Sequence, residues 1–290
     1  MNVKSSNVIT DPVNVARRLN VAALQLVSTG DIDANFAQIR SLLHRQFEQS
    51  PVDLVVLPEN ALCFDATLLV QVARRADEYL DLFQALAREF GCALIIGSMP
   101  FLQRPDGTPT DGRCRTACIA LDRTGKVVGR YDKIHLFDVN VGDAHGSYRE
   151  SESFEPGDQS VVVELAGVKI GLSICYDLRF PQLFQALRRQ GAELIVVPAA
   201  FTRKTGEAHW EPLLRARAIE NQCYVIAPNQ GGRHSPSRET WGHSMIMSPW
   251  GEIMAQCDFG PDLICAEADL DRLVQIRRDL PCFEHIRPFA

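Results

Sequence analysis

The sequence has no long apolar run. Its longest apolar stretches are far too short to span a bilayer, which excludes a membrane-spanning helix. Arg17 and Arg18, followed by "LNVAALQLV", faintly resemble a twin-arginine export signal, but polar residues interrupt the run at 28–31 and no small-residue cleavage site follows. We therefore expect a first core strand at 21–27, after a disordered or loosely attached tail over residues 1–18.

An excess of basic charge is also lacking. The 30 basic and 36 acidic residues give a net charge of -6, and no long block of like charge occurs. Binding to nucleic acid favours a basic field, so this balance argues against a nucleic-acid partner. No membrane partner is expected either, because no segment is long and apolar enough to span a bilayer.

The nine cysteines lack the spacing of a disulfide framework or of a zinc site. Their number is odd, and Cys114 and Cys118 are separated by three intervening residues in a strand-like run with no second pair to complete a metal site. No metal-ligand spacing is found either among the histidines His209, His234, His243 and His285. We expect no metal or other cofactor, and mostly buried free thiols in a reducing, cytoplasmic compartment.

No repeat, linker or low-complexity segment divides the chain, so residues 19–290 are expected to form a single domain. Apolar alternation predicts strands at 21–27, 54–57, 93–97, 116–121, 127–131, 160–164, 169–174, 194–197, 224–227, 242–247, 253–256 and 263–268. Helical periodicity predicts helices at 32–49, 66–90, 181–190, 209–222 and 270–278. This pattern indicates an α/β domain with two sheets packed face to face and helices outside.

One cysteine lies at a junction between a predicted strand and a predicted helix. In "VKIGLSICYDLRFPQ", alternation puts Cys175 on the face of Lys169, Gly171 and Ser173, which is poor in bulky side chains. Pro181 suits the first turn of the following helix. A thiol at such a turn has backbone N–H groups beside it that can hold a developing oxyanion, so Cys175 is either a nucleophile or a core cysteine.

Two further strand ends carry ionisable side chains. "VDLVVLPEN" ends in Glu59, and "GRYDKIHLFD" places Tyr131 and Lys133 on one face of its strand. Taken alone, Glu59 is interpreted as a solvated loop residue and Lys133 as a surface lysine. Taken with Cys175 they make a chemical set, because a thiol with a pKa of about 8.5 needs a base or a nearby cation to become a nucleophile at pH 7.

The motifs "LPEN", "YDKIHLFD", "YRESESFEPGD" and "SICYDLRFP", in this order, resemble the nitrilase superfamily of carbon–nitrogen hydrolases over about residues 19–289. The segments "HWEPLLRARAIENQCYVIA" and "GHSMIMSPWGE" add to the resemblance. It implies a four-layer αββα sandwich, a homodimer or higher homo-oligomer, and a catalytic triad of Glu59, Lys133 and Cys175. Glu150 resembles the additional glutamate that orients the substrate in this family.

Two segments, "FTRKTGEAHW" and "GRHSPSRETWGHS", resemble the branch that contains ω-amidase and deaminated glutathione amidase, and are nearer to the latter. The loop at 139–151 departs from the branch pattern. The resemblance implies hydrolysis of a small carboxylate-bearing amide through a cysteine thioester. The implied substrate is deaminated glutathione, with 2-oxoglutaramate, 2-oxosuccinamate or an N-carbamoyl compound as alternatives.

The backbone N–H of Tyr176 is expected to hold the oxyanion with Lys133. Arg179 follows the nucleophile closely enough to bind a substrate carboxylate in a bidentate contact, although an ion pair that fixes the loop is an equal alternative. The residues Tyr148, Phe201 and Thr205 complete the predicted substrate-binding set.

Two other functions remain open. A thiol hydrolase that resembles the glutamine amidotransferases would use a Cys–His pair, with His135 or His209 as its base. A non-enzymatic protein would be a thiol redox sensor or an inactive scaffold, and the complete Glu–Lys–Cys set argues against the scaffold.

Overall fold

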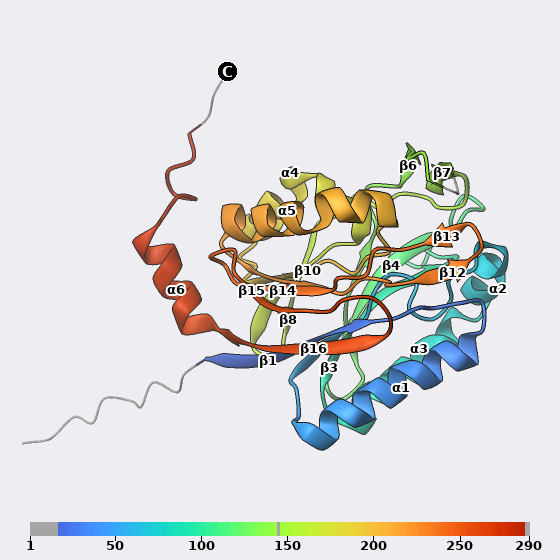
Figure 1. Cartoon of the computed structure of the whole chain (residues 1–290), viewed down its shortest axis with the longest axis horizontal. Coiled ribbons are helices and arrows are strands. Elements are labelled where there is room, and N and C mark those ends of the chain that lie inside the picture. Colours follow the sequence, from blue (N-terminus) through green and yellow to red (C-terminus); the bar gives the residue numbers. More distant parts are fainter. Residues whose placement is uncertain (1–16, 144–145, 288–290) are drawn as a thin grey trace, which may run out of the picture.

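The computed structural model describes residues 17–143 and 146–287, in which two six-stranded sheets lie face to face (Figure 1). The first sheet, in spatial order, consists of β16 (Asp262–Asp269), β1 (Arg18–Gln25), β2 (Leu54–Val56), β3 (Ala93–Phe101), β4 (Arg115–Leu121) and β5 (Val127–Asp132). The second consists of β15 (Ile253–Gln256), β14 (Met245–Met247), β11 (Tyr224–Ala227), β10 (Leu194–Val196), β9 (Val168–Leu172) and β8 (Val161–Leu165).

Helices cover both outer faces, which gives the predicted four-layer αββα sandwich. In Figure 1, α1 (Ile32–Gln49) and α3 (Ala76–Phe90) lie under the first sheet, and α4 (Pro181–Arg189) and α5 (Arg203–Asn221) lie over the second. The remaining helices are α2 (Leu69–Arg74), α6 (Leu270–Asp279) and the 3₁₀ helices η1 (Ala66–Leu68), η2 (Glu150–Glu152) and η3 (Cys175–Arg179). Among the described residues, none of the helices is both long enough and apolar enough to cross a bilayer.

Alternation along the strands explains the layers. In β1, Val21 and Ala23 face the second sheet, whereas Ala22 and Leu24 face the helices α1 and α3. A fully buried valine or leucine such as Val21 or Leu24 contributes about 1.5–3 kcal/mol to folding, and a buried alanine less, so a strand with two buried faces is held firmly.

Parallel pairing brings strand ends to one edge of each sheet. β1, β2 and β3 are parallel to one another, as are β9, β10 and β11. β5 runs in the direction of β3, because both are antiparallel to β4. Loops that follow β2, β5 and β9 therefore leave the sandwich at its carboxyl-end edge, the usual location of sites in open α/β sheets.

Several predicted boundaries are wrong. The helix predicted at 66–90 is divided into η1, α2 and α3, with Arg75 as the break at φ −111° and ψ 20°. Asp77 and Glu78 lie in the first turn of α3, and acidic residues there indicate the start of a helix. The prediction missed this start because the apolar periodicity continues across it. The helix predicted at 209–222 begins at Arg203, because the Thr202 side chain caps it by accepting from the Thr205 N–H.

Two short hairpins escaped prediction: β6 (Asp138–Asn140) with β7 (Ser147–Arg149), and β12 (Arg233–Ser235) with β13 (Arg238–Glu239). Their strands of two or three residues are too short to show alternation. The predicted tail at 1–18 lies outside the described residues except for Arg17 and Arg18, and Arg18 already begins β1.

Candidate active site

The loops after β2, β5 and β9 bring Glu59, Lys133 and Cys175 together. All three side chains are buried, with exposed fractions of 5%, 2% and 8%. The loop that carries Glu59 passes close to β3 at Gly97, where a Cβ atom would lie only 2.1 Å from the Pro58 carbonyl oxygen. A glycine is required at this position, since any side chain would push the Glu59 loop away from the sheet.

The Lys133 ammonium lies between two carboxylates. Its Nζ donates to Glu59 Oε1 at 2.8 Å and to the two oxygens of Glu150 at 2.8 and 2.9 Å. The backbone N–H of Phe137 donates to Glu150 Oε2 at 2.6 Å and fixes that carboxylate in turn. A buried cation with three short bonds to two carboxylates is held in one orientation.

The environment shifts the pKa values of this cluster. Burial opposes the charge of Lys133, but the charges of Glu150, Glu59 and Cys175 outweigh it and raise the lysine pKa well above its usual value. Burial, with repulsion from Glu59, raises the pKa of the Glu150 carboxyl despite the attraction of Lys133. The ammonium therefore stays charged throughout the physiological pH range.

Cys175 lies at a strained point of the chain. The strand ends at Leu172, so alternation does not extend to Cys175 as expected, and the residue adopts a left-handed backbone with φ +48°. This conformation costs a residue with a side chain about 1–2 kcal/mol. Cys175 lines the same cavity as Glu59. Burial and the charge of Glu59 raise the Cys175 pKa well above its usual value despite the opposing charge of Lys133.

A buried aspartate that the sequence analysis missed links the cysteine turn to the lysine loop. Asp177 is fully buried, and its Oδ2 accepts from the Ile174 N–H at 2.9 Å and from the Tyr131 hydroxyl at 2.7 Å. Its Oδ1 accepts from the His135 N–H at 3.1 Å and lies 2.7 Å from His135 Nδ1. The sequence could have indicated Asp177 by its position, two residues after the cysteine and at the start of a helical turn, where an acidic side chain can accept from free backbone N–H groups.

A cavity of about 220 Å³ opens above Cys175. Every residue that the sequence analysis assigned to the site lies on its wall: Glu59, Lys133, Tyr148, Glu150, Cys175, Tyr176, Arg179, Phe201 and Thr205. The Arg179 guanidinium lies over the rings of Tyr176 and Phe201, at 5.8 and 5.3 Å from their centroids. Stacking leaves the donors in the guanidinium plane accessible to a carboxylate in the cavity, although one of them, on Nη1, lies 3.2 Å from His209 Nδ1.

The two histidines considered as alternative bases have other partners. The His135 ring contacts Asp177 and stacks on Phe180 with centroids 3.7 Å apart, and His209 Nδ1 lies 3.2 Å from Arg179 Nη1. Neither residue lines the cavity that contains Cys175. Within the described ranges, no group of three or more His, Cys, Asp or Glu side chains is arranged to hold a metal ion.

The wall also includes Arg238, from the β12–β13 hairpin, and Asn60, which the sequence analysis did not single out. Asn60 turns the chain after Glu59 with φ +56°, a conformation in which asparagine is enriched. Arg238 lies far along the chain from the motifs, in a hairpin too short to predict, so no local pattern identified it.

Comparisons with known proteins reveal similar sequences and similar folds. The family model described as carbon-nitrogen hydrolase matches residues 20–278. The deaminated glutathione amidase of Yersinia enterocolitica is 43% identical, with 93% of this chain and 94% of that protein covered. The crystal structure of Saccharomyces cerevisiae Nit3, a member of branch 10 of the nitrilase superfamily, aligns with a TM-score of 0.80, 29% identity and coverage of 91% and 94%. The structure of the Caenorhabditis elegans NitFhit protein aligns with a TM-score of 0.84 and 36% identity, over 93% of this chain and 65% of that one.

Proposed function

Because the chain belongs to the carbon–nitrogen hydrolase family, within the nitrilase superfamily, we propose that it hydrolyses deaminated glutathione with Cys175 as its nucleophile. The protein is a hydrolase of carbon–nitrogen bonds, and the observation that carries the proposal is the arrangement of its ionisable groups. The Lys133 ammonium lies 2.8 Å from Glu59, and both line the cavity into which Cys175 opens.

Acylation begins with the neutral thiol. Since the Cys175 pKa is raised, the thiol keeps its proton until Glu59 removes it as the sulfur attacks the amide carbonyl carbon. The carbonyl oxygen becomes an oxyanion, which accepts from the Lys133 ammonium and from the backbone N–H of Tyr176 in the first turn of η3. Each such donor lowers the barrier by about 3–4 kcal/mol.

The tetrahedral intermediate then loses its amine. Glu59 passes the proton to the amide nitrogen, the carbon–nitrogen bond breaks, and cysteinylglycine leaves a 2-oxoglutaryl thioester on Cys175. Water attacks the thioester carbonyl with Glu59 as its base, the carbon–sulfur bond breaks, and the proton returns to the thiol as 2-oxoglutarate departs. Glu150 holds the ammonium in place through both steps with its bonds of 2.8 and 2.9 Å.

The choice of substrate is supported by the relatives and by the charge in the cavity. Proteins named deaminated glutathione amidase share 40–43% identity with most of the chain. Arg179 offers a bidentate donor for the 2-oxo acid carboxylate, and the Thr205 hydroxyl lies on the same wall. An ω-amidase substrate such as 2-oxoglutaramate would use the same contacts, because it carries the same acyl group.

A substrate panel tests the proposal. Purified protein is incubated with deaminated glutathione, 2-oxoglutaramate, 2-oxosuccinamate and an N-carbamoyl amino acid, and the acid and amine products are quantified. We expect the highest kcat/KM with deaminated glutathione and a 2-oxoglutaryl adduct on Cys175 by mass spectrometry. A higher value with 2-oxoglutaramate would assign ω-amidase activity, and thiol oxidation without turnover of any amide would assign a redox sensor.

A variant series separates the two choices of base. Glu59→Gln should abolish turnover, while a His135→Gln and His209→Gln double variant should keep it. The opposite result would assign the Cys–His mechanism.

The protein is also proposed to act as a homodimer in a reducing, cytoplasmic compartment. Exposed apolar side chains on α5 and on the C-terminal segment support the dimer, with Ile219, Val274, Leu280 and Ile286 each about half exposed. α6 projects beyond the edge of the sheets in Figure 1, where a second copy could cover it. Sedimentation at micromolar concentration tests this, and a monomer there would contradict it. The nine free cysteines support the reducing compartment, which fractionation of cells would test.

A further inference from the structure

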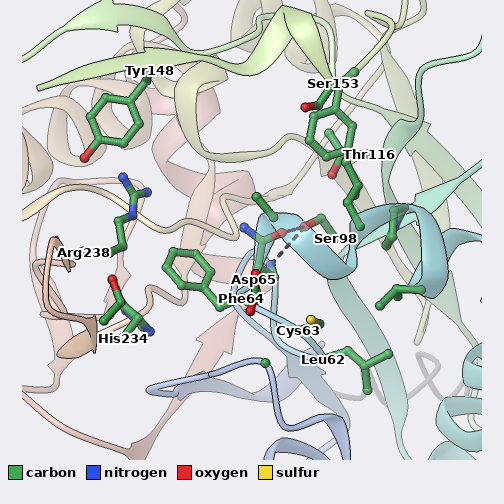
Figure 2. Close-up of a pocket in the computed structure, with 18 of the residues that line it drawn as sticks. Leu62, Cys63, Phe64, Asp65, Ser98, Thr116, Tyr148, Ser153, His234 and Arg238 are labelled. Carbon is green, nitrogen blue, oxygen red and sulfur yellow. Dashed lines mark hydrogen bonds between the residues drawn. The ribbon is translucent and has the colours of Figure 1, made fainter. Parts of the chain in front are cut away.

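A second, larger cavity adjoins the one above Cys175. It has a volume of about 440 Å³, twice that of the first, which is within the range of small-molecule sites (Figure 2). The two cavities share the wall residues Asn60, Ala66, Tyr148, Ser153, Phe154 and Arg238. A molecule whose carbonyl lies at Cys175 can therefore extend from one cavity into the other.

The larger cavity is mainly apolar, with polar groups at separate points. Leu62 and Phe64 contribute apolar surface, while Ser98, Thr116 and Ser153 contribute hydroxyls on the side opposite Arg238 in Figure 2. The carboxylate of Asp65 is occupied, because its Oδ1 accepts from the Thr67 N–H at 2.9 Å and from the Thr67 hydroxyl at 2.7 Å. Such a lining suits a neutral or anionic peptide-like group better than a cation.

Arg238 is the positively charged residue at the junction of the two cavities. Its guanidinium lies over the rings of Tyr148 and Phe64, at 4.6 and 5.3 Å from their centroids, which fixes the plane of its donors. Its Nη1 is buried and has no hydrogen-bond partner among the described residues. A buried guanidinium nitrogen without an acceptor is costly in the empty site, and a substrate carboxylate or carbonyl would satisfy it.

The hairpin that carries Arg238 is anchored to the loop that follows β1. His234 Nδ1 lies 2.7 Å from the Ser28 carbonyl oxygen, so it donates there, and Nε2 then accepts from the Thr240 hydroxyl at 2.7 Å. Arg238 Nη2 reaches the Ala200 carbonyl oxygen at 3.5 Å. The guanidinium is therefore held by a fixed support, as a specificity-determining group requires.

We propose that the larger cavity binds the amine half of the substrate, a dipeptide, and that Arg238 recognises the carboxylate of that half. This inference rests on the proposed function and adds to it the group that selects the leaving amine. The acyl half stays on Cys175 as the thioester after the amine departs, so it must be the half held in the smaller cavity with Glu59 and Arg179. The amine half, which leaves first, is assigned to the adjoining cavity.

Two substrates with one acyl group test the proposal. Deaminated glutathione releases cysteinylglycine and 2-oxoglutaramate releases ammonia, so only the first uses the larger cavity. Arg238→Met should lower kcat/KM for deaminated glutathione by about tenfold or more, the usual effect of losing a charge-assisted hydrogen bond, and should lower that for 2-oxoglutaramate by a much smaller factor. Arg233→Met, an exposed arginine on β12 of the same hairpin, is the matched control and should change neither value.

A measurement on the wild-type enzyme keeps the test independent of variant folding. Supplied with 2-oxoglutaramate and cysteinylglycine, the enzyme should form deaminated glutathione: the amine attacks the thioester carbonyl, the carbon–sulfur bond breaks, and the amine proton passes to the thiol. Equal losses on both substrates in Arg238→Met, or no loss on either, would overturn the proposal, as would failure to form deaminated glutathione. Failure of the wild-type enzyme to hydrolyse either substrate would instead refute the proposed function, and this inference with it.

Discussion

Lys133 combines two tasks in one side chain. Its ammonium is almost fully buried and forms short bonds to Glu59 and Glu150, so it neutralises charge that would otherwise repel within the site. It also faces the cavity in which the oxyanion would form. Removal of one partner from a buried ionic cluster costs about 3–5 kcal/mol, because the remaining charges have neither water nor a counterion.

Lys133→Met is expected to affect rate, reactivity and stability together. The loss of an oxyanion donor should lower kcat by about 100-fold or more. The Cys175 pKa should rise further, because the cation that favours the thiolate is gone. Alkylation by iodoacetamide measured against pH would show its midpoint at higher pH than in the wild type.

Two variants provide the controls for this prediction. Lys126→Met removes an exposed lysine and should change neither kcat nor the alkylation midpoint. The double variant Lys133→Met with Glu150→Gln should regain part of the lost stability, because one unbalanced carboxylate is removed, without regaining kcat. An unchanged midpoint and the parent rate in Lys133→Met would exclude any catalytic part for the lysine.

At the scale of elements, the short helix η3 and the loop after β5 behave as one unit because Asp177 joins them. Its two oxygens accept from groups on both segments, and it is fully buried. The left-handed conformation of Cys175 persists only if its surroundings enforce it, and the bond from the Ile174 N–H to Asp177 lies directly before that residue. Asp177 is therefore a positioning residue, which acts on the thiol through the backbone.

Asp177→Asn is predicted to lower both stability and kcat. The amide places an NH₂ group among donors, so at least one buried donor is left without an acceptor, at a cost of about 1–3 kcal/mol. Chemical denaturation would measure the loss of stability. The kcat should fall while KM changes little, since substrate contacts are retained; a stability loss with an unchanged kcat would assign Asp177 a structural part only.

The β12–β13 hairpin gives a prediction about pH. Burial of His234 lowers its pKa from 6.5 to about 4, so the folded protein keeps it neutral where the unfolded chain binds a proton. The free energy of unfolding should therefore fall as the pH drops from about 6.5 to about 4. Above pH 6.5 the His234 ring is neutral in both the folded and the unfolded chain, so it causes no change with pH there.

Denaturant unfolding at pH 7 and pH 5 tests the assignment. The difference in unfolding free energy between the two pH values should be smaller in His234→Gln than in the wild type. His285→Gln, at an exposed histidine, should keep the wild-type difference. If His234→Gln loses as much unfolding free energy between pH 7 and pH 5 as the wild type does, other groups cause the acid sensitivity.

At the scale of the whole molecule, sequence patterns predicted the layers of the fold and the motifs of the site, but not where several helices begin and end or which hairpins connect the strands. Alternation over long strands and the motifs around Glu59, Lys133 and Cys175 have local causes, so the sequence reveals them. The reach of Arg238 into the site depends on contacts between segments far apart in the chain, which periodicity does not register. The break at Arg75 has a local signal, the acidic residues Asp77 and Glu78 that follow it, but the apolar periodicity continues across it. The roles of the site residues remain predictions until they are tested by substitution.

The pairing of β1 with β16 affects how the protein is made. Every residue of β1 from Arg18 to Gln25 has its partner in Asp262–Asp269, more than two hundred residues later. During synthesis, one long edge of the first sheet stays open until β16 leaves the ribosome, and an unpaired apolar edge is a template for aggregation. A nascent chain arrested before Asp262 should therefore require a chaperone to remain dispersed, whereas the released full-length chain closes that edge with its own strand.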